Sequence, residues 1–424
     1  MTETSGSTLN GYWHRIRHFS LNAKQYIIAN TILGFAYGTS GAIYNLFLLS
    51  LGYSNTFLGG ILSISYVSIA ISALFVGPLC TRIGAARTTI LGVVILTASA
   101  MWRVLNPVPE VLILGEVIGG VGISLTWVAF SPFLSEYSTA YERTHLFGTT
   151  QSLNIISMFL GSTLAGLLPV WFAVALSLPI DSAPTFQLAL VSWVIPLLLA
   201  VIPLLLIREQ NRFRKQKLET AVKQPEQTTV QNEPKGNFGI VAWFALLYVI
   251  LGIGAGFIVP FLNVFFWNFY NLPTPAVGLI QGLGSASMAL GTFLAPVLSS
   301  RIGKVRAIIV VQTLSLPFLV TLAVIVDPFI ASIGYIFRQV FMTASIPIDG
   351  ALQMELVPQS WRTHLSAVIT FFFNAALAIS AQITGQLYDL GLYLLPFWFT
   401  LICYSIATAL YGFLYKPEKR LLTN

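Results

Sequence analysis

Long apolar runs, separated by short polar or Gly/Pro-containing breaks, dominate the chain from about residue 25 onward. A membrane-spanning helix takes about 20 mostly apolar residues, and twelve runs of this kind can be marked off. The first six cover approximately residues 25–51, 56–80, 86–106, 109–135, 145–175 and 185–207. The second six cover approximately residues 238–268, 273–299, 305–326, 328–356, 364–388 and 390–415. The pattern therefore predicts an all-α polytopic membrane protein with twelve transmembrane helices.

The composition strengthens this prediction. Only 9% of the 424 residues are Asp, Glu, Lys or Arg, and 56% are hydrophobic, whereas a soluble globular domain carries about 25% charged residues. These charges are too few to cover a water-exposed surface, which excludes soluble enzymes, nucleic-acid-binding proteins and secreted disulfide scaffolds. We therefore expect the lipid bilayer, and no nucleic acid, as a partner.

One long hydrophilic stretch divides the spans into two sets of six. It covers residues 208–237 and is rich in Lys, Gln, Glu and Thr, which is typical of a flexible tether. Contact of its basic residues with anionic lipid headgroups is the alternative. The predicted organisation is an N-terminal tail (1–24), a six-helix bundle (25–207), the linker (208–237), a second six-helix bundle (238–415) and a C-terminal tail (416–424).

The basic residues predict the orientation. If the N-terminus is cytoplasmic, all but two of the 22 Lys and Arg residues fall on the cytoplasmic side. The exceptions are Arg103, near the outer end of span 3, and Arg338, within span 10. Because cytoplasmic loops carry an excess of Lys and Arg, we expect both termini to be cytoplasmic.

Residues of the two halves match at a constant offset of 219 positions. The segment Arg82-Ile83-Gly84 recurs as Arg301-Ile302-Gly303. Further matching pairs are Arg87 with Arg306, Glu136 with Glu355, Gly59 with Gly278, and Gly166 with Gly385. Six spans fit in one repeat, so matched loops lie on the same membrane face. The two repeats are therefore parallel, which is one known plan of secondary transporters.

The repeated loop resembles the signature of the major facilitator superfamily between spans 2 and 3. That signature has a Gly, then an Asp, an Arg or Lys, a Gly and further basic residues, and the stretch from Gly77 to Arg87 has this layout. Thr81 and Ser300 stand where the family usually has Asp. The resemblance implies a secondary transporter whose halves rock about a central site. It disfavours a drug/proton antiporter, because span 5 lacks the Gly-Pro pair of that branch.

The resemblance also implies a cytoplasmic latch that favours the outward-open state. In such a latch, a carboxylate at the cytoplasmic end of span 4 or 10 meets an arginine of the neighbouring loop, and simple positive-inside anchoring is the alternative. We expect the latch to consist of Glu136 facing Arg82 or Arg87, and of Glu355 facing Arg301 or Arg306.

Three ionisable residues fall within predicted spans: Glu116 in span 4, and Arg338 and Asp349 in span 10. Each costs about 2.5–3.5 kcal/mol at the bilayer centre on insertion scales, so each should face a cavity or a partner. The resemblance places spans 4 and 10 at the central cavity, and we expect Glu116 to pair with Arg338 across the two halves. Such a pair can bind substrate, carry a coupling proton or serve as a static ion pair. Asp349 lies nearer the cytoplasm, where solvation is the alternative to a direct role.

Asn45 in span 1 and Asn263 in span 7 occupy near-equivalent places in the two halves. Because spans 1 and 7 line the pathway in the resembled family, these amides are candidates for hydrogen bonds to substrate. Hydrogen bonding between helices is the alternative. Asn154 and Asn374 form a second related pair.

We therefore expect a secondary active transporter that moves a small organic solute by rocker-switch alternating access, with proton coupling left open. A non-transporting receptor or a facilitative uniporter is the alternative. The spans contain no cluster of nucleophile, base or metal-ligand residues, so we expect no enzyme activity, no metal and no cofactor. A monomer in the cytoplasmic membrane of a bacterium is the expected form.

Overall fold

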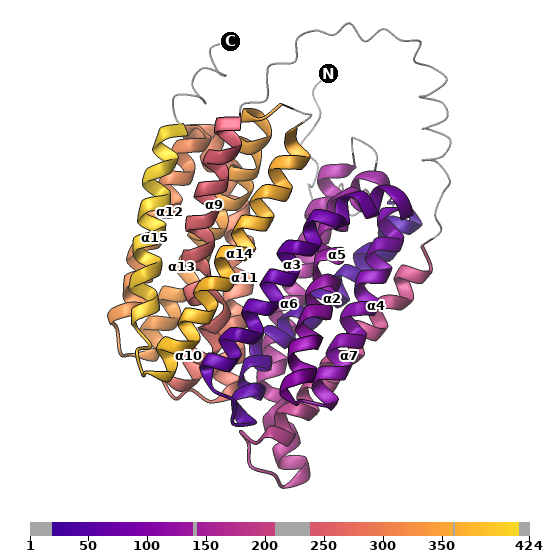
Figure 1. Ribbon diagram of the computed structural model, residues 1–424, viewed down its shortest axis with the longest axis vertical. Coiled ribbons are helices and arrows are strands. Elements are labelled where there is room, and N and C mark those ends of the chain that lie inside the picture. The colour runs from indigo at the N-terminus through magenta and orange to yellow at the C-terminus, as the bar shows by residue number, and fades with distance from the viewer. Residues whose placement is uncertain (1–18, 139–141, 208–237, 359–360, 415–424) are drawn as a thin grey trace, which may run out of the picture.

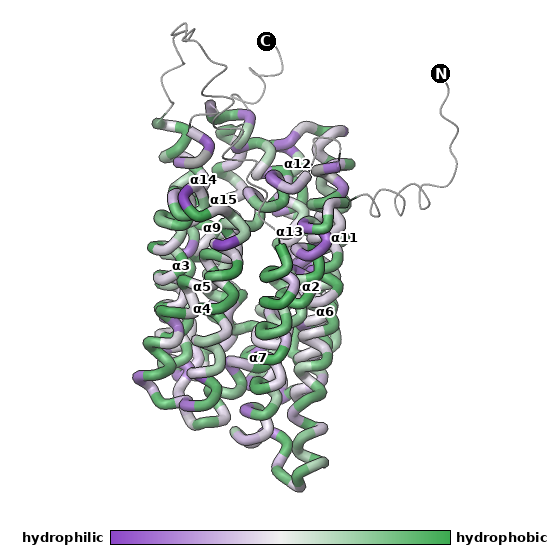
Figure 2. The backbone as a smooth tube through the Cα atoms, turned by 90° about the vertical axis from the view of Figure 1, so that its right-hand side faces the viewer, coloured by the Kyte–Doolittle hydropathy of each residue, from purple (hydrophilic) through white to green (hydrophobic). Residues whose placement is uncertain are grey.

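The computed structural model describes residues 19–138, 142–207, 238–358 and 361–414. Within these residues the protein is all-helical, and twelve helical segments are long and apolar enough to cross a membrane, which confirms the predicted fold class. Large hydrophobic side chains such as Phe75, Val174 and Phe293 are exposed on the outer surface, as lipid-facing residues are. Hydrophilic positions gather toward the two ends of the bundle (Figure 2). The predicted linker, the C-terminal tail and most of the N-terminal tail lie outside the described residues.

The first six spans form one group of helices (Figure 1). They are α2 (Leu21–Ser50), α3 (Asn55–Ile83), α4 (Ala85–Leu105), α5 (Pro109–Glu136), α6 (Arg143–Leu176) and α7 (Ala183–Leu205). Successive helices run in opposite directions. We name the end of the molecule where α2 begins the terminal end, and the opposite end the far end.

The second six spans form the other group (Figure 1). They are α9 (Phe238–Ile258) with η1 (Val259–Phe261) and α10 (Leu262–Asn268), then α11 (Thr274–Ile302), α12 (Lys304–Val324), α13 (Pro328–Leu356), α14 (Arg362–Asp389), and α15 (Leu395–Tyr411) with η3 (Gly412–Leu414).

Two spans have local features that the apolar pattern does not predict. The seventh span, predicted over 238–268, is present at these bounds, but within it a 3₁₀ turn around Pro260 separates α9 from α10, because proline has no N–H for the helical ladder. The twelfth was predicted to start at residue 390. It starts at Leu395, after a turn in which Gly391 has φ +76°, a conformation that favours glycine.

The repeated loop glycines have a backbone role. Gly84 ends α3 and precedes α4 with φ +90°, and Gly303 does the same between α11 and α12 with φ +84°. A residue with a Cβ is disfavoured in this region of φ. The Arg-Ile-Gly repeat therefore marks the sharp turn between two spans in each half.

Four other repeated glycines lie where the two halves touch. Gly59 and Gly385 lie at the crossing of α3 and α14, and Gly166 and Gly278 at the crossing of α6 and α11. A Cβ on Gly59 would lie 2.8 Å from the backbone oxygen of Ala381, and one on Gly278 would lie 2.6 Å from that of Ser162. Both crossings lie in the far part of the bundle, so the halves are closed against each other there.

Candidate functional site

A cavity of about 350 Å³ lies in the first half, a volume at the lower end of the range for small-molecule sites. Its walls come from α2, α4, α5 and α6 and carry no ionisable group apart from tyrosine. The lining residues are Tyr26, Asn30, Leu33, Tyr37, Thr89, Thr126, Trp127, Phe130, Gln151, Asn154 and Met158. This lining of aromatic rings, hydroxyls and amides suits an uncharged polar molecule with an apolar face.

Some polar groups of the cavity hydrogen bond within the protein, and others are available to hydrogen bond to a ligand. The hydroxyls of Tyr37 and Thr126 lie 3.2 Å apart and hydrogen bond, and Asn154 Nδ2 donates to the backbone oxygen of Asn30 at 2.8 Å. Among the described residues, nothing hydrogen bonds to the side-chain amide of Gln151 or to the side-chain oxygen of Asn154. The ring of Trp127 meets Tyr37 edge-on and is 59% exposed, so it offers a face for stacking.

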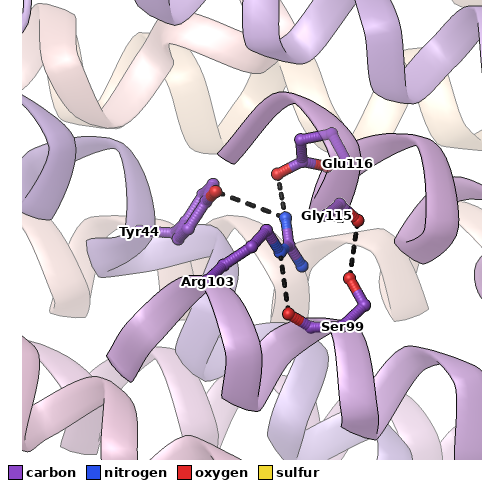
Figure 3. A network of polar contacts seen from close by, with 5 residues as sticks. All are labelled: Tyr44, Ser99, Arg103, Gly115 and Glu116. Atoms are coloured by element: carbon purple, nitrogen blue, oxygen red, sulfur yellow. Dashed lines mark hydrogen bonds and ion pairs between the residues drawn. The ribbon is translucent and has the colours of Figure 1, made fainter. Parts of the chain in front are cut away.

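The buried charge of the first half forms a pair within that half, shown in Figure 3. The Arg103 side chain on α4 donates to the Glu116 carboxylate on α5, and both residues are about 5% exposed. Arg103 also donates to the hydroxyl of Tyr44 on α2 at 3.3 Å. The predicted pair of Glu116 with Arg338 is therefore wrong. Arg103 does lie near the end of its helix, as expected, but its long side chain extends along α5 past Gly115 and Gly119 and so reaches Glu116.

Two glycines on α5 make room for that arginine. A Cβ on Gly115 would lie 2.5 Å from Arg103 Cδ, and one on Gly119 would lie 3.4 Å from Nη2. Ser99 strengthens the crossing, because its hydroxyl donates to the backbone oxygen of Gly115 at 2.6 Å. The Gly-x-x-x-Gly spacing in α5 thus provides both close helix contact and a cradle for a buried cation.

Arg338 on α13 faces its own half. Its guanidinium donates to Gln339 Oε1 at 3.0 Å and to the Tyr404 hydroxyl at 3.4 Å, and lies over the Tyr404 ring. Its Nε has no hydrogen-bond partner in the described segments, although the residue is only 2% exposed. In the part of the chain that the structure describes, no carboxylate forms an ion pair with it.

Asp349, three turns further along α13, is also buried, which argues against the alternative of a solvated side chain. Its Oδ2 accepts a hydrogen bond from the Tyr248 hydroxyl of α9 at 2.6 Å and another from Gln353 Nε2 at 2.7 Å. Among the residues that the structure describes, its Oδ1 has no hydrogen-bond partner. No Lys or Arg of the described segments forms an ion pair with this carboxyl.

Asn45 and Asn263 hydrogen bond to each other across the two halves. Asn45 Nδ2 donates to Asn263 Oδ1 at 3.0 Å and to the backbone oxygen of Pro260 at 2.6 Å. Asn263 Nδ2 donates in return to the backbone oxygens of Gly41 and Ala42, each at 3.1 Å. Because both side-chain amides form these hydrogen bonds, Asn45 and Asn263 join α2 to α10 near the far end. Neither residue lines the cavity.

The predicted latch residues lie at the terminal end. Arg82, Arg87, Arg301 and Arg306 are exposed there. Glu355 pairs with Lys304 at 2.8 Å, so the expectation of Arg301 or Arg306 as its partner is wrong, although the loop that supplies the partner is the expected one. The contact of Glu136 with Arg82 or Arg87 stays a prediction.

Residues 26–381 match the Major Facilitator Superfamily. Since this match covers most of the chain, the protein belongs to that family of transporters. None of the curated proteins matches the sequence significantly.

Solved transporter structures share the fold. The chain is 12% identical to the nucleoside transporter NupG, with a TM-score of 0.69 and coverage of 92% of this chain and 99% of that one. It is 12% identical to a bacterial homologue of the human lysosomal transporter Spinster in an inward-facing state (TM-score 0.70, 98% and 99% covered). It is 16% identical to a D-xylose–proton symporter (TM-score 0.67, 92% and 96% covered). At these identities the similarity concerns the fold.

Proposed function

We propose that the protein is a secondary active transporter that moves a small, uncharged, polar organic solute by alternating access. The observation that carries this proposal is the cavity beside Tyr37, Trp127 and Gln151. A charged solute brought into this cavity would lose hydration without gaining a counter-ion, which is costly. A neutral solute can hydrogen bond to the amides and stack on the indole ring.

The contacts between the two halves support the proposal of alternating access. The halves touch through the far-end crossings and through the Asn45–Asn263 contact, and Figure 1 shows them converging toward that end. This arrangement is a conformation closed at the far end. With the positive-inside pattern, we propose that the terminal end is cytoplasmic and that the protein is inward-facing here. A bacterial cytoplasmic membrane as the location and a monomer as the working unit remain predictions.

Proton coupling is supported by Asp349 more than by Glu116. Within the described segments Glu116 has a counter-ion in Arg103, whereas Asp349 has no counter-ion and keeps one buried oxygen without a hydrogen-bond partner. Carboxyls buried within membrane spans are the groups that carry protons in many transporters, and this one could exchange its proton when the halves rearrange and water reaches it. We propose Asp349 as the proton-carrying group of a symport or antiport cycle.

Reconstitution in proteoliposomes tests the proposal. Uptake of labelled neutral solutes, such as nucleosides and monosaccharides, is measured beside nucleotides and sugar phosphates, with and without a pH gradient. We expect a neutral solute to accumulate only when a gradient is imposed. Equilibration without accumulation identifies a facilitative uniporter. A solute that binds but never crosses the membrane contradicts transport and points to a receptor.

A further inference from the structure

At the far end, two carboxylates each reach across to the first turn of a helix in the opposite half. Asp389, the last residue of α14, lies against the start of α3, and Asp181, between α6 and α7, lies against the start of α11. The contacted residues, Asn55 and Thr274, are 219 positions apart, which is the offset of the internal repeat. The two helix starts that receive the contacts are therefore at pseudo-equivalent places of the molecule.

Asp389 accepts hydrogen bonds from backbone N–H groups at the N-terminus of α3. The first backbone N–H groups of a helix have no partner within it, and they lie at the positive end of the helix dipole. Asp389 Oδ1 accepts from the backbone N–H and the side-chain amide of Asn55, both at 2.9 Å, and Oδ2 accepts from the N–H of Thr56 at 2.8 Å. The third N–H, of Phe57, is capped within its own half by Ser54 Oγ at 3.1 Å. Two of the three groups therefore depend on the other half.

The contact at α11 is smaller. The Thr274 hydroxyl donates to Asp181 Oδ1 at 3.0 Å. The helix begins after Pro273, which offers no side-chain cap, and Pro275 has no N–H to donate. A single hydrogen bond therefore stands here in place of three, and we expect this contact to contribute less.

We propose that Asp389 and Asp181 form a far-end latch, which favours the conformation closed at the far end and must break when that end opens. Both carboxylates bond groups of the half from which they would have to separate. Opening leaves the N–H groups of Asn55 and Thr56 to water, while contacts inside each half persist. The latch rests on the proposed alternating access, but it sets a conformational equilibrium that can be measured without any solute.

The chain supplies a matched control for the chemistry. Asp327 also sits exposed at the far end and caps a helix, accepting from the N–H groups of Phe329 and Ile330 at 3.0 and 2.9 Å. These groups belong to its own half, at the start of α13. Removal of Asp327 weakens a helix cap without loosening any contact between halves.

The equilibrium is measured on the full-length protein in lipid nanodiscs by electron–electron double resonance. Native Cys80 and Cys403 are free thiols and are first replaced by serine. Spin labels are then placed through Val108→Cys and Leu392→Cys, two exposed far-end positions on opposite halves. Long distances report the far-end-open state and short distances the closed state.

We expect Asp389→Ala to raise the open-to-closed ratio by roughly three- to tenfold, a moderate effect because the exposed carboxylate is screened by solvent. Asp181→Ala should raise it less, and Asp327→Ala should leave it unchanged. Unchanged distances in Asp389→Ala, or an equal shift in Asp327→Ala, would overturn the latch. If Asp389→Ala does not fold, Asp389→Asn and Thr274→Val give the same test, since each weakens one contact and keeps the helix.

Discussion

The pair of Arg103 and Glu116 makes a quantitative prediction possible. Replacing Glu116 by Gln keeps the shape of the side chain but leaves the arginine cation buried without a counter-ion. Breaking a buried ion pair from one side costs about 3–5 kcal/mol. The remaining contacts of Arg103, with the Tyr44 hydroxyl at 3.3 Å and the Ser99 carbonyl at 3.4 Å, are long and compensate only in part. We therefore expect Glu116→Gln to destabilise the first half by about 3 kcal/mol.

The measurement is the thermal midpoint of the purified, monodisperse protein in detergent. About 3 kcal/mol corresponds to a fall of roughly 6 °C or more if the six-helix half unfolds as a unit. The joint replacement Arg103→Met with Glu116→Leu should recover much of the loss, because a buried pair can be exchanged for apolar residues of similar volume.

Glu355→Gln is the control for this prediction, because Glu355 belongs to a partly exposed pair with Lys304. Pairs of that kind contribute about 0–1 kcal/mol, so little change is expected. A Glu116→Gln protein with the wild-type midpoint but an altered pH dependence of uptake would refute the structural role. It would assign Glu116 to proton handling instead.

Three further changes have defined outcomes. Trp127→Ala removes the exposed ring of the cavity and should weaken solute binding about tenfold, measured by titration calorimetry, with Trp398→Ala on the outer surface as control; equal affinities would remove Trp127 from the site. Asp349→Asn should abolish accumulation driven by a pH gradient while solute exchange continues, and a wild-type response to the gradient would contradict proton coupling there. Gly166→Val places side-chain atoms against the Thr274 backbone, where a Cβ would already lie 2.6 Å from its oxygen. It should raise the far-end-open fraction in the spin-label assay, and an unchanged distribution would show that this crossing does not hold the halves together.

The helices and the repeat could be predicted from the sequence because both depend on local or periodic signals. Apolar runs long enough for a helix to cross the bilayer identify the spans. The offset of 219 positions identifies matching glycines such as Gly59 and Gly278 in the two halves. Their role at the crossings did not follow from the repeat. It depends on which faces of the helices meet, and only the packed structure shows that.

The site could be predicted only in part, because partners of buried charges depend on helix rotation and side-chain reach. Glu116 was correctly recognised as a charge within a span, but a depth argument alone did not reveal Arg103 as its partner. Asn45 and Asn263 were recognised as equivalent, yet their hydrogen bonds join the halves. Trp127 and Gln151 carried no signal that sets them apart from other aromatic and amide residues of the spans.

Side-specific labelling of the cavity tests alternating access most directly. Gln151→Cys, in a protein whose two native cysteines are replaced by serine, is exposed in proteoliposomes to a membrane-impermeant thiol reagent from one side at a time. Without solute, we predict rapid labelling from the side of the terminal end. During solute exchange, that rate should fall and labelling from the far-end side should appear. Labelling from one side alone, at a rate that no transported solute or gradient changes, would contradict the account.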